Sequence, residues 1–338
     1  MKGNRIWKID LTLIVLLTLF LLSATILYHK IFTPVSLNTP EKIINIPEGS
    51  GIKTISRSLK SAGLIRNATA FYLLSVIQGK SSLKAGEYNL NPGMTPFEIL
   101  DILEQGRVVQ HKITIPEGFN IYQIANLFGE KGLSDKEVFL TLCSDPNILE
   151  YWKIEGATAE GYLFPETYFF SKGISEKRIL DAMIRNFWKT FKPEFVERAK
   201  ELGFTVHEIV IMASLIEKET ALPEERPLIS AVFHKRLKEG IRLQCDPSVI
   251  YGLKNFDGNL TKNDLVKLTP YNTYKIRGLP TGPIANPGLG CLEAALYPAN
   301  VNYKYFVSRN DGSHEFSETL LQHNRAVLKY QKRRTRNL

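Results

Sequence analysis

The hydrophobic pattern of the chain begins with an uninterrupted apolar run. Residues 11–28 carry no charged side chain and consist mainly of Leu, Ile, Val and Phe. As a helix rising about 1.5 Å per residue, this run is about 27 Å long, close to the roughly 30 Å core of a bilayer. A cleaved signal peptide is the alternative, but the run is long for one. The pattern favours a retained membrane helix, and no later run is long enough to span a bilayer.

A second pattern occurs twice. Residues 44–49 read Ile-Asn-Ile-Pro-Glu-Gly and residues 113–118 read Ile-Thr-Ile-Pro-Glu-Gly, and the apolar register continues to Leu64 and Leu133. Each copy predicts a short alternating strand, a Pro-Glu-Gly turn and an amphipathic helix that ends at a glycine. The sequence therefore predicts an internal repeat, unless the two strand–helix pairs resemble each other by chance.

The resemblance continues behind each copy. The segments 88–101 and 168–181 both begin with a short aromatic strand and lead through a glycine turn into a helix. Thr95 and Ser175 stand at the expected N-caps of these helices. Two small α+β units are therefore expected, over residues 42–110 and 111–195.

Beyond these units the pattern changes. Helices are predicted over 207–220 and 225–238, and the stretch 243–298 is rich in Gly, Pro, Asn and Tyr. Alternating strands around an Asn-Asp-Gly turn predict a hairpin over 305–316. A basic helix is expected from about residue 318, so this region is mixed α/β with long loops.

The net positive charge of the chain is concentrated at its two ends. The chain has 43 Lys+Arg and 34 Asp+Glu, a net charge of +9. Residues 1–30 hold +3 and residues 327–338 hold +5, which leaves +1 for the remainder. A nearly neutral body argues against nucleic-acid binding, which needs many phosphate contacts. The basic residues before the apolar run place the N-terminus in the cytoplasm and the rest of the chain outside it.

Several chemistries are disfavoured by what the sequence lacks. The three cysteines, Cys143, Cys245 and Cys291, form no CxxC pair and are too few for a disulfide scaffold. The six histidines form no HExxH motif, and no P-loop, dinucleotide fingerprint or GxSxG elbow is present. We therefore expect no metal and no cofactor.

Glu219 is the first catalytic candidate. On a helical wheel of about 100° per residue it falls in the stripe formed by Met212, Leu215 and Ile216, whereas Glu217 falls on another face. Burial and the negative end of the helix dipole both raise the pKa of a carboxyl group. Glu219 would then keep its proton near neutral pH, as a general acid requires. The alternative is a structural ion pair with a basic residue.

The loops behind this helix supply binding candidates. Aromatic rings stack on the apolar face of a sugar, and amides and carboxylates bond its hydroxyls. Long, stiff loops often carry such residues, although an Ω-loop packed on itself is the alternative. The candidate substrate-binding residues are Gln244, Asp246, Tyr271, Asn272, Tyr274 and Asn286.

Four motifs in this order resemble a known family. They are the segment 213–220 (ASLIEKET), the segment 243–247 (LQCDP), the segment 271–274 (YNTY) and the segment 278–280 (GLP). Together they are similar to the YceG-like family of endolytic murein transglycosylases, and the resemblance covers nearly the whole chain. Thr281 and Cys245 depart from the residues that are common in the family at these positions, which affects only the expected fine contacts of the loops.

The resemblance implies an α+β fold with one transmembrane helix, LysM-like α/β modules and a mixed α/β catalytic domain with a loop-rich cleft. The expected parts are a cytoplasmic N-terminus (1–10), a transmembrane anchor (11–28), a linker (29–41), a LysM-like module (42–110), a second strand–helix unit (111–195), the catalytic domain (196–328) and a basic tail (329–338).

The resemblance also implies an activity. Glu219 is the family's catalytic acid, and the reaction is cleavage of the MurNAc–GlcNAc β-1,4 bond of peptidoglycan to leave a 1,6-anhydro end. The enzyme would act in the cytoplasmic membrane with its catalytic domain outside, ending the growth of nascent strands. Its implied partners are glycan strands and the penicillin-binding proteins or other peptidoglycan synthases.

Two alternatives remain. A muramidase-type hydrolase would need a second carboxylate, for which Asp246 is the candidate. A catalytically dead, anchored peptidoglycan-binding scaffold would keep the repeat and lose the acid.

Overall fold

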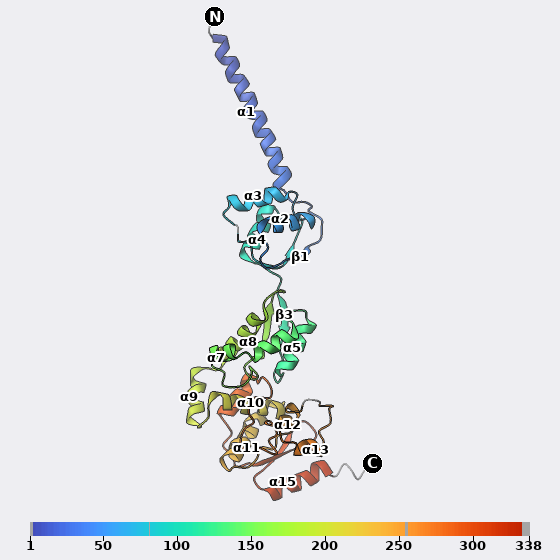
Figure 1. Ribbon diagram of the computed structural model, residues 1–338, viewed down its shortest axis with the longest axis vertical. Coiled ribbons are helices and arrows are strands. Elements are labelled where there is room, and N and C mark those ends of the chain that lie inside the picture. Colours follow the sequence, from blue (N-terminus) through green and yellow to red (C-terminus); the bar gives the residue numbers. More distant parts are fainter. Residues whose placement is uncertain (1–2, 81, 254–255, 333–338) are drawn as a thin grey trace. The chain divides into compact units, whose positions relative to one another are not determined.

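The computed structural model describes residues 3–80, 82–253 and 256–332 (Figure 1). It divides into two compact units. Unit 1 comprises residues 1–111 and 169–174, and unit 2 comprises residues 112–168 and 175–338.

Unit 1 begins with the long helix α1 (Gly3–Phe32). Within the described residues, α1 is the one helix that is long and apolar enough to cross a membrane, over Leu11–His29. This agrees with the predicted run over 11–28. The predicted linker over 29–41 starts later than expected, because residues 29–32 are still helical. The backbone N–H groups of Val35 and Ser36 donate to Pro92 O, so the linker lies against unit 1.

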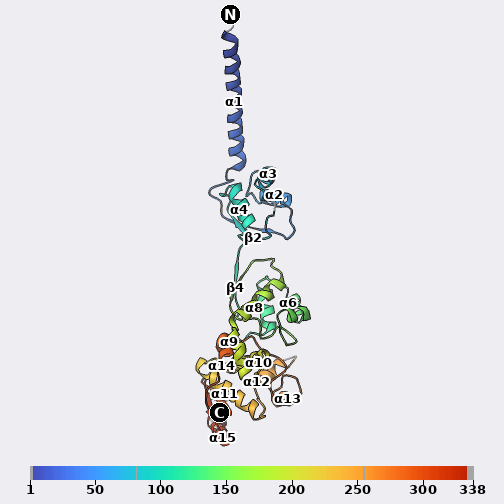
Figure 2. The same cartoon turned by 90° about the vertical axis from the view of Figure 1, so that its left-hand side faces the viewer.

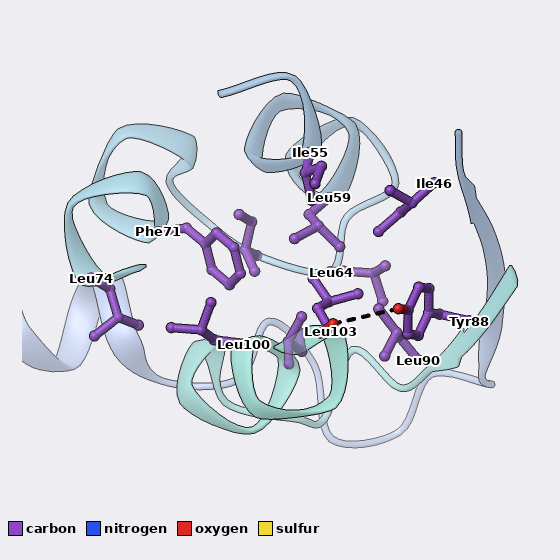
Figure 3. Close-up of a cluster of buried hydrophobic side chains, with 12 residues drawn as sticks. Ile46, Ile55, Leu59, Leu64, Phe71, Leu74, Tyr88, Leu90, Leu100 and Leu103 are labelled. Carbon is purple, nitrogen blue, oxygen red and sulfur yellow. Dashed lines mark hydrogen bonds between the residues drawn. The ribbon is translucent and has the colours of Figure 1, made fainter. Parts of the chain in front are cut away.

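The rest of unit 1 is a two-stranded sheet covered by three helices. The antiparallel strands pair from Lys42↔Leu90 to Ile46↔Gly86. Figure 3 shows the core between sheet and helices, where Leu64 and Leu90 lie beside Tyr88 and Leu100 lies nearer to Phe71. The Tyr88 hydroxyl donates to Lys84 O at 2.7 Å, which satisfies the polar end of this buried ring. The elements are β1 (Lys42–Ile46), α2 (Ile52–Ser61), α3 (Ala68–Ile77), β2 (Gly86–Leu90) and α4 (Pro96–Gln105).

Unit 2 is mostly helical. The chain passes into it within β3, returns to unit 1 within β4 for residues 169–174, and then stays in unit 2. Its first part contains β3 (His111–Thr114), α5 (Ile121–Glu130), α6 (Lys136–Cys143), α7 (Pro146–Tyr151), β4 (Thr167–Phe170), α8 (Glu176–Thr190) and α9 (Pro193–Glu201). The second part contains α10 (Val206–Glu219), η1 (Pro223–Glu225), α11 (Arg226–Lys238), α12 (Asp246–Tyr251), α13 (Lys262–Val266), α14 (Leu289–Leu296), β5 (Tyr305–Ser308), β6 (His314–Ser317), α15 (Leu320–Val327) and a final π-helical turn (Leu328–Lys332).

The predicted internal repeat is confirmed in the backbone. β1 leads through its turn into α2, and β3 leads through the same turn into α5. Gly49 and Gly118 both adopt φ 75°, a left-handed conformation that glycine tolerates without strain. The second pair also matches, since β2 precedes α4 and β4 precedes α8. Thr95 caps α4 as expected, whereas Ser175 precedes α8 without a side-chain cap.

The division of the chain differs from the expected one in one respect. Residues 112–168 and 175–195 belong to the same compact unit as residues 196–338. The second copy of the repeat is therefore built into unit 2, and no boundary between compact units lies at residue 195. The α+β class and the single N-terminal apolar helix are confirmed, whereas the LysM-like assignment stays a prediction.

Helix α10 runs through the centre of unit 2. Thr205 caps it through a reciprocal capping box with Glu208, and the helix contacts α9, α11, α12 and α14. Every residue from Ile209 to Ile216 is buried, so the predicted single apolar stripe is wrong. A helix surrounded by other helices needs no polar face. Its buried middle positions the polar residues of its last turn.

Candidate active site

Glu219 is the last residue of α10, and Thr220 behind it is extended, with φ −142° and ψ 140°. The Glu219 side chain is partly buried and faces Cys245, Asp246, His314 and Arg236. Burial raises the pKa of the Glu219 carboxyl to about 7. This value is the net result of several influences: burial, the largest, and the nearby charge of Asp246 raise the pKa, while the Cys245 thiol, His314 and Arg236 lower it. The carboxyl is therefore half protonated near neutral pH, in the direction that the sequence predicted.

Cys245 holds one side of this carboxyl. Its thiol hydrogen-bonds the Glu219 carboxylate, and burial raises the thiol pKa well above its ordinary value. The thiol therefore stays protonated and acts as a hydrogen-bond donor. The Cys245 backbone N–H donates to Thr273 Oγ1 at 2.9 Å, which fixes the loop behind the acid.

Gln244 and Asp246 flank Cys245 and are both exposed. Gln244 has φ 54°, a strained conformation for a residue with a side chain, and its N–H donates to Thr273 O. The Tyr274 hydroxyl donates to Asp246 Oδ1 at 2.6 Å. The structure thus brings three of the predicted binding residues, Gln244, Asp246 and Tyr274, to the loop that faces Glu219.

Arg236 supplies a fixed positive charge behind the same loop. It is buried on α11 and donates from Nη1 to Leu243 O at 2.7 Å and from Nε to Lys304 O at 2.7 Å. Its guanidinium also lies over the Tyr305 ring at 5.2 Å. These contacts tie the loop after α11 to the strand β5.

The residue after the acid is held by a network that sequence reasoning missed. The Thr220 hydroxyl donates to Glu225 Oε2 at 3.1 Å. The same buried carboxylate accepts the His314 backbone N–H and hydrogen-bonds His314 Nδ1, both at 2.7 Å. His314 lies in the hairpin that the sequence predicts over 305–316, but the pattern gives it no partner. Glu225 lies 89 residues away in the chain, so no local pattern links the two.

Glu217 is positioned on a different side of α10. Its carboxylate accepts the Gly288 N–H at 3.0 Å, and Lys218 Nζ donates to Gly118 O at 3.2 Å. The Pro-Glu-Gly turn of the second repeat copy therefore contacts the end of the helix that carries Glu219. The separation of Glu217 from Glu219, predicted from the wheel, holds.

Two of the predicted binding residues are buried inside the loops. Asn272 is fully buried, donates to Lys267 O and accepts the Tyr274 N–H. Asn286 is also fully buried, accepts the Leu163 N–H and donates to Phe119 O. In this structure neither side chain is accessible to a ligand. Both amides bond backbone groups in the loops. Composition alone cannot distinguish this structural role of an Asn from a role in binding sugar.

Tyr271 has a mixed environment. Its ring meets Tyr251 edge-on at 4.8 Å, and its hydroxyl hydrogen-bonds Thr281. The side chain is half-buried. It supports the neighbouring loop, and its remaining exposed edge is the part available to a ligand.

A second buried carboxyl group escaped the sequence reasoning altogether. Glu160 is buried and accepts hydrogen bonds from Ile121 N, from the Tyr251 hydroxyl and from Asn286 Nδ2. Burial raises its pKa to about 8 despite these donors. The group ties the start of α5 to α12 and to the loop before α14. Among the described residues no group of three or more His, Cys, Asp or Glu side chains could hold a metal ion.

Comparison with known proteins identifies the fold. The model of the YceG-like family matches residues 44–329. The chain belongs to the YceG-like family. The match covers both copies of the repeat, the helix α10 and the hairpin, so the resemblance noted in the sequence is confirmed.

Two curated relatives carry the same name. The endolytic murein transglycosylase of Bacillus subtilis is 34% identical, over 92% of this chain and 91% of that protein. The endolytic murein transglycosylase of Streptococcus pneumoniae serotype 2 is 30% identical, over 88% of this chain. This YceG-like chain spans 60% of the streptococcal protein's length.

A solved structure supports the same family. The crystal structure of a YceG-like protein from Listeria monocytogenes matches with a TM-score of 0.59 and 34% identity, over 84% of this chain and 98% of that one. The prediction that this YceG-like chain is an enzyme, a lyase of the lytic transglycosylase class, is confirmed by these relatives.

Proposed function

We propose that this chain is a membrane-anchored endolytic transglycosylase of peptidoglycan, with Glu219 as its catalytic acid. The observation that carries the proposal is the position of Glu219 in a YceG-like chain. It ends a buried helix, and its pKa of about 7 lets it hold a proton at neutral pH. The names of the relatives indicate murein as the substrate, and the geometry places the Glu219 carboxyl where it can act as an acid.

The proposed reaction needs one acid and no water. Glu219 donates its proton to the glycosidic oxygen between MurNAc and GlcNAc, and the bond from C1 to that oxygen breaks through an oxocarbenium-like state. The Glu219 carboxylate then takes the proton of the MurNAc C6 hydroxyl, whose oxygen attacks C1. The products are a free GlcNAc hydroxyl and a 1,6-anhydro ring, and Glu219 is protonated again.

The surrounding residues have supporting roles in this proposal. The Cys245 thiol donates to the Glu219 carboxylate and stabilises its charged form after proton transfer. Glu225 fixes Thr220 and His314, and thereby the end of α10. Gln244, Asp246 and Tyr274 are the proposed substrate contacts, with the exposed edge of Tyr271 beside them. Asn272 and Asn286 are proposed as residues that shape the loops.

The anchor and the repeat complete the proposal. α1 fits a single-pass membrane anchor with the N-terminus in the cytoplasm and unit 2 outside it. The LysM-like reading of the repeat gives it a role in holding glycan. We further propose that cleavage terminates the elongation of nascent strands beside penicillin-binding proteins or other synthases. The contacts around Glu219 support the chemistry, whereas the role at the synthases is tested in cells by measuring the length of nascent strands with and without the active protein.

Product analysis tests the reaction. Purified peptidoglycan digested with the full chain is expected to give fragments that end in 1,6-anhydro-MurNAc, lighter by one water than reducing ends, in mass spectrometry. Reducing ends would instead identify a muramidase. Asp246 is the carboxylate for that alternative, because its charge acts on Glu219. Binding without new ends of either kind would identify a scaffold.

The pH dependence of cleavage tests the electrostatics. Glu219 acts in its protonated form, so the rate is expected to fall as pH rises through about 7. His314 lowers the Glu219 pKa and Asp246 raises it. His314→Gln should therefore move the alkaline limb of kcat/KM to higher pH, and Asp246→Asn should move it to lower pH. Equal profiles for all three proteins would contradict the assignment of Glu219 as the titrating acid.

A further inference from the structure

Helix α2 and the segments on either side of α3 carry a local positive charge that the nearly neutral body conceals. Between residues 52 and 85 the sequence has six basic residues and no acidic one. Lys80 is paired with Asp101 and Glu104 from α4. Lys53 and Arg57 on α2 have no acidic partner within the described part of the chain, and Lys53 Nζ lies 5.3 Å from the centre of the Tyr72 ring.

Helix α3 also exposes an apolar stripe. It contains no charged residue, and Leu73, Val76 and Ile77 are 51%, 52% and 82% exposed. At about 100° per residue, these three side chains share one face with Thr69 and Tyr72. Phe71 and Leu74 on the other face are buried in the core of unit 1. One face of α3 therefore packs in the core of unit 1, and the opposite face exposes aliphatic side chains.

The basic and apolar features adjoin each other. A cavity of about 270 Å³ lies between α2 and α3 at the Tyr72 end of the stripe. It offers two cations and three hydroxyls, which suit a phosphate group. Its lining residues are Lys53, Ser56, Arg57, Ala68, Thr69 and Tyr72.

This surface lies where the anchor ends. Arg66, directly before α3, donates from Nη2 to Pro34 O at 2.8 Å, two residues beyond the end of α1. Phe32, the last residue of α1, packs on Phe97 with ring centroids 5.4 Å apart. Figures 1 and 2 both show α3 at the end of unit 1 from which α1 emerges. The start of α3 is therefore held beside the point at which the chain leaves the membrane helix.

We propose that α3 lies on the surface of the same bilayer that α1 spans, with Leu73, Val76 and Ile77 among the acyl chains and Lys53 and Arg57 on the phosphates of anionic lipids. An apolar helix face flanked by basic residues is the pattern of an interfacial helix. The inference rests on the proposed anchoring by α1 and is independent of the proposed activity. A glycan strand fits this surface less well, because Leu73, Val76 and Ile77 are aliphatic and the Tyr72 ring on the same face already lies under Lys53 Nζ.

Depth-dependent quenching in the full chain tests the proposal. A polarity-sensitive dye is attached at Val76→Cys, and the protein is reconstituted into vesicles of phosphatidylcholine and phosphatidylglycerol that carry spin-labelled lipid. The native cysteines are buried, which limits their labelling. The matched control is Ile43→Cys, an apolar residue of the same unit that is 66% exposed. It lies on the face of β1 opposite the core, since Ile44 and Ile46 point inward. A dye at Leu19→Cys reports on α1.

The expected result is a several-fold larger loss of fluorescence at position 76 than at position 43. Combining Lys53→Gln and Arg57→Gln should reduce that difference, as should vesicles of phosphatidylcholine alone. Quenching at position 19 without quenching at position 76 would overturn the proposal and leave the anchor intact. Absence of quenching at both positions would overturn the anchor as well. Equal quenching at positions 76 and 43, or a dye at 76 that responds to glycan fragments and not to vesicles, would also overturn it.

Discussion

Glu219→Gln is expected to lower the rate of glycan cleavage by about 10²–10⁴-fold, the usual contribution of a positioned general acid. Gln keeps the shape of the side chain but has no proton to give to the glycosidic oxygen. It also cannot accept the proton of the C6 hydroxyl in the second half of the reaction. Both proton transfers fail together, so the rate is expected to fall while glycan binding is retained. Single-turnover release of muropeptide-containing fragments from purified peptidoglycan measures the rate.

Glu217→Gln is the matched control. It makes the same chemical change two residues earlier on the same helix, on the side that faces Gly288. A Gln oxygen can still accept the Gly288 N–H, so the end of α10 should stay in place. Activity close to that of the unchanged protein is expected for Glu217→Gln. Loss of activity in this control, or full activity of Glu219→Gln, would refute the assignment of Glu219.

Stability separates a chemical effect from misfolding. Burial raises the Glu219 pKa from its ordinary 4.5 to about 7, so the folded state binds this proton more tightly than the unfolded state. The contribution of this group to stability therefore falls as pH rises from about 4.5 to about 7. Gln carries no charge at any pH. The Glu219→Gln protein should accordingly be at least as stable as the unchanged protein above pH 7.

The sequence was most informative where the pattern is local. The repeat was predicted because each copy is a short strand, a turn with a left-handed glycine and a helix, and all three have signals a few residues long. The raised pKa of Glu219 was predicted because this acid lies in a helical pattern at a position where a charge is unfavourable, and its catalytic role stays a prediction. Burial as a cause of its raised pKa could be anticipated. The effects of its four neighbours could not, because they lie on α11, at the start of α12 and in the distant hairpin.

The sequence was least informative where polar side chains form buried hydrogen bonds with the backbone of distant segments. Asn272 and Asn286 look like ligand-binding amides in a polar loop, but each closes several backbone hydrogen bonds inside it. The sequence analysis did not single out Glu225 or Glu160, since nothing adjacent to them in the chain marks them as buried. Their partners are 89 and up to 126 residues away. Burial of this kind is decided by tertiary packing.

Glu160→Ala is expected to lower the free energy of unfolding by about 3–5 kcal/mol, as the loss of one partner from a buried polar network does. The substitution leaves the Ile121 N–H, the Tyr251 hydroxyl and one Asn286 N–H without their acceptor. These donors lie on α5, on α12 and in the loop before α14, so several elements around α10 lose a shared contact. Urea unfolding followed by circular dichroism at constant pH measures the change.

Two further variants make the Glu160 result specific. Glu166→Ala removes an exposed carboxylate nearby and should change the stability by no more than about 0.5 kcal/mol. Glu160→Gln keeps one acceptor oxygen and should cost less than Glu160→Ala. Burial raises the Glu160 pKa to about 8, so the folded state holds the proton and this group's contribution to stability falls as pH rises from about 4.5 to about 8. The cost of Glu160→Gln should therefore shrink across that range. An Ala variant as stable as Glu166→Ala would show that the network does not hold unit 2 together. A large loss of stability would instead show that Glu160 links the second repeat copy, through Ile121, to the elements packed around α10.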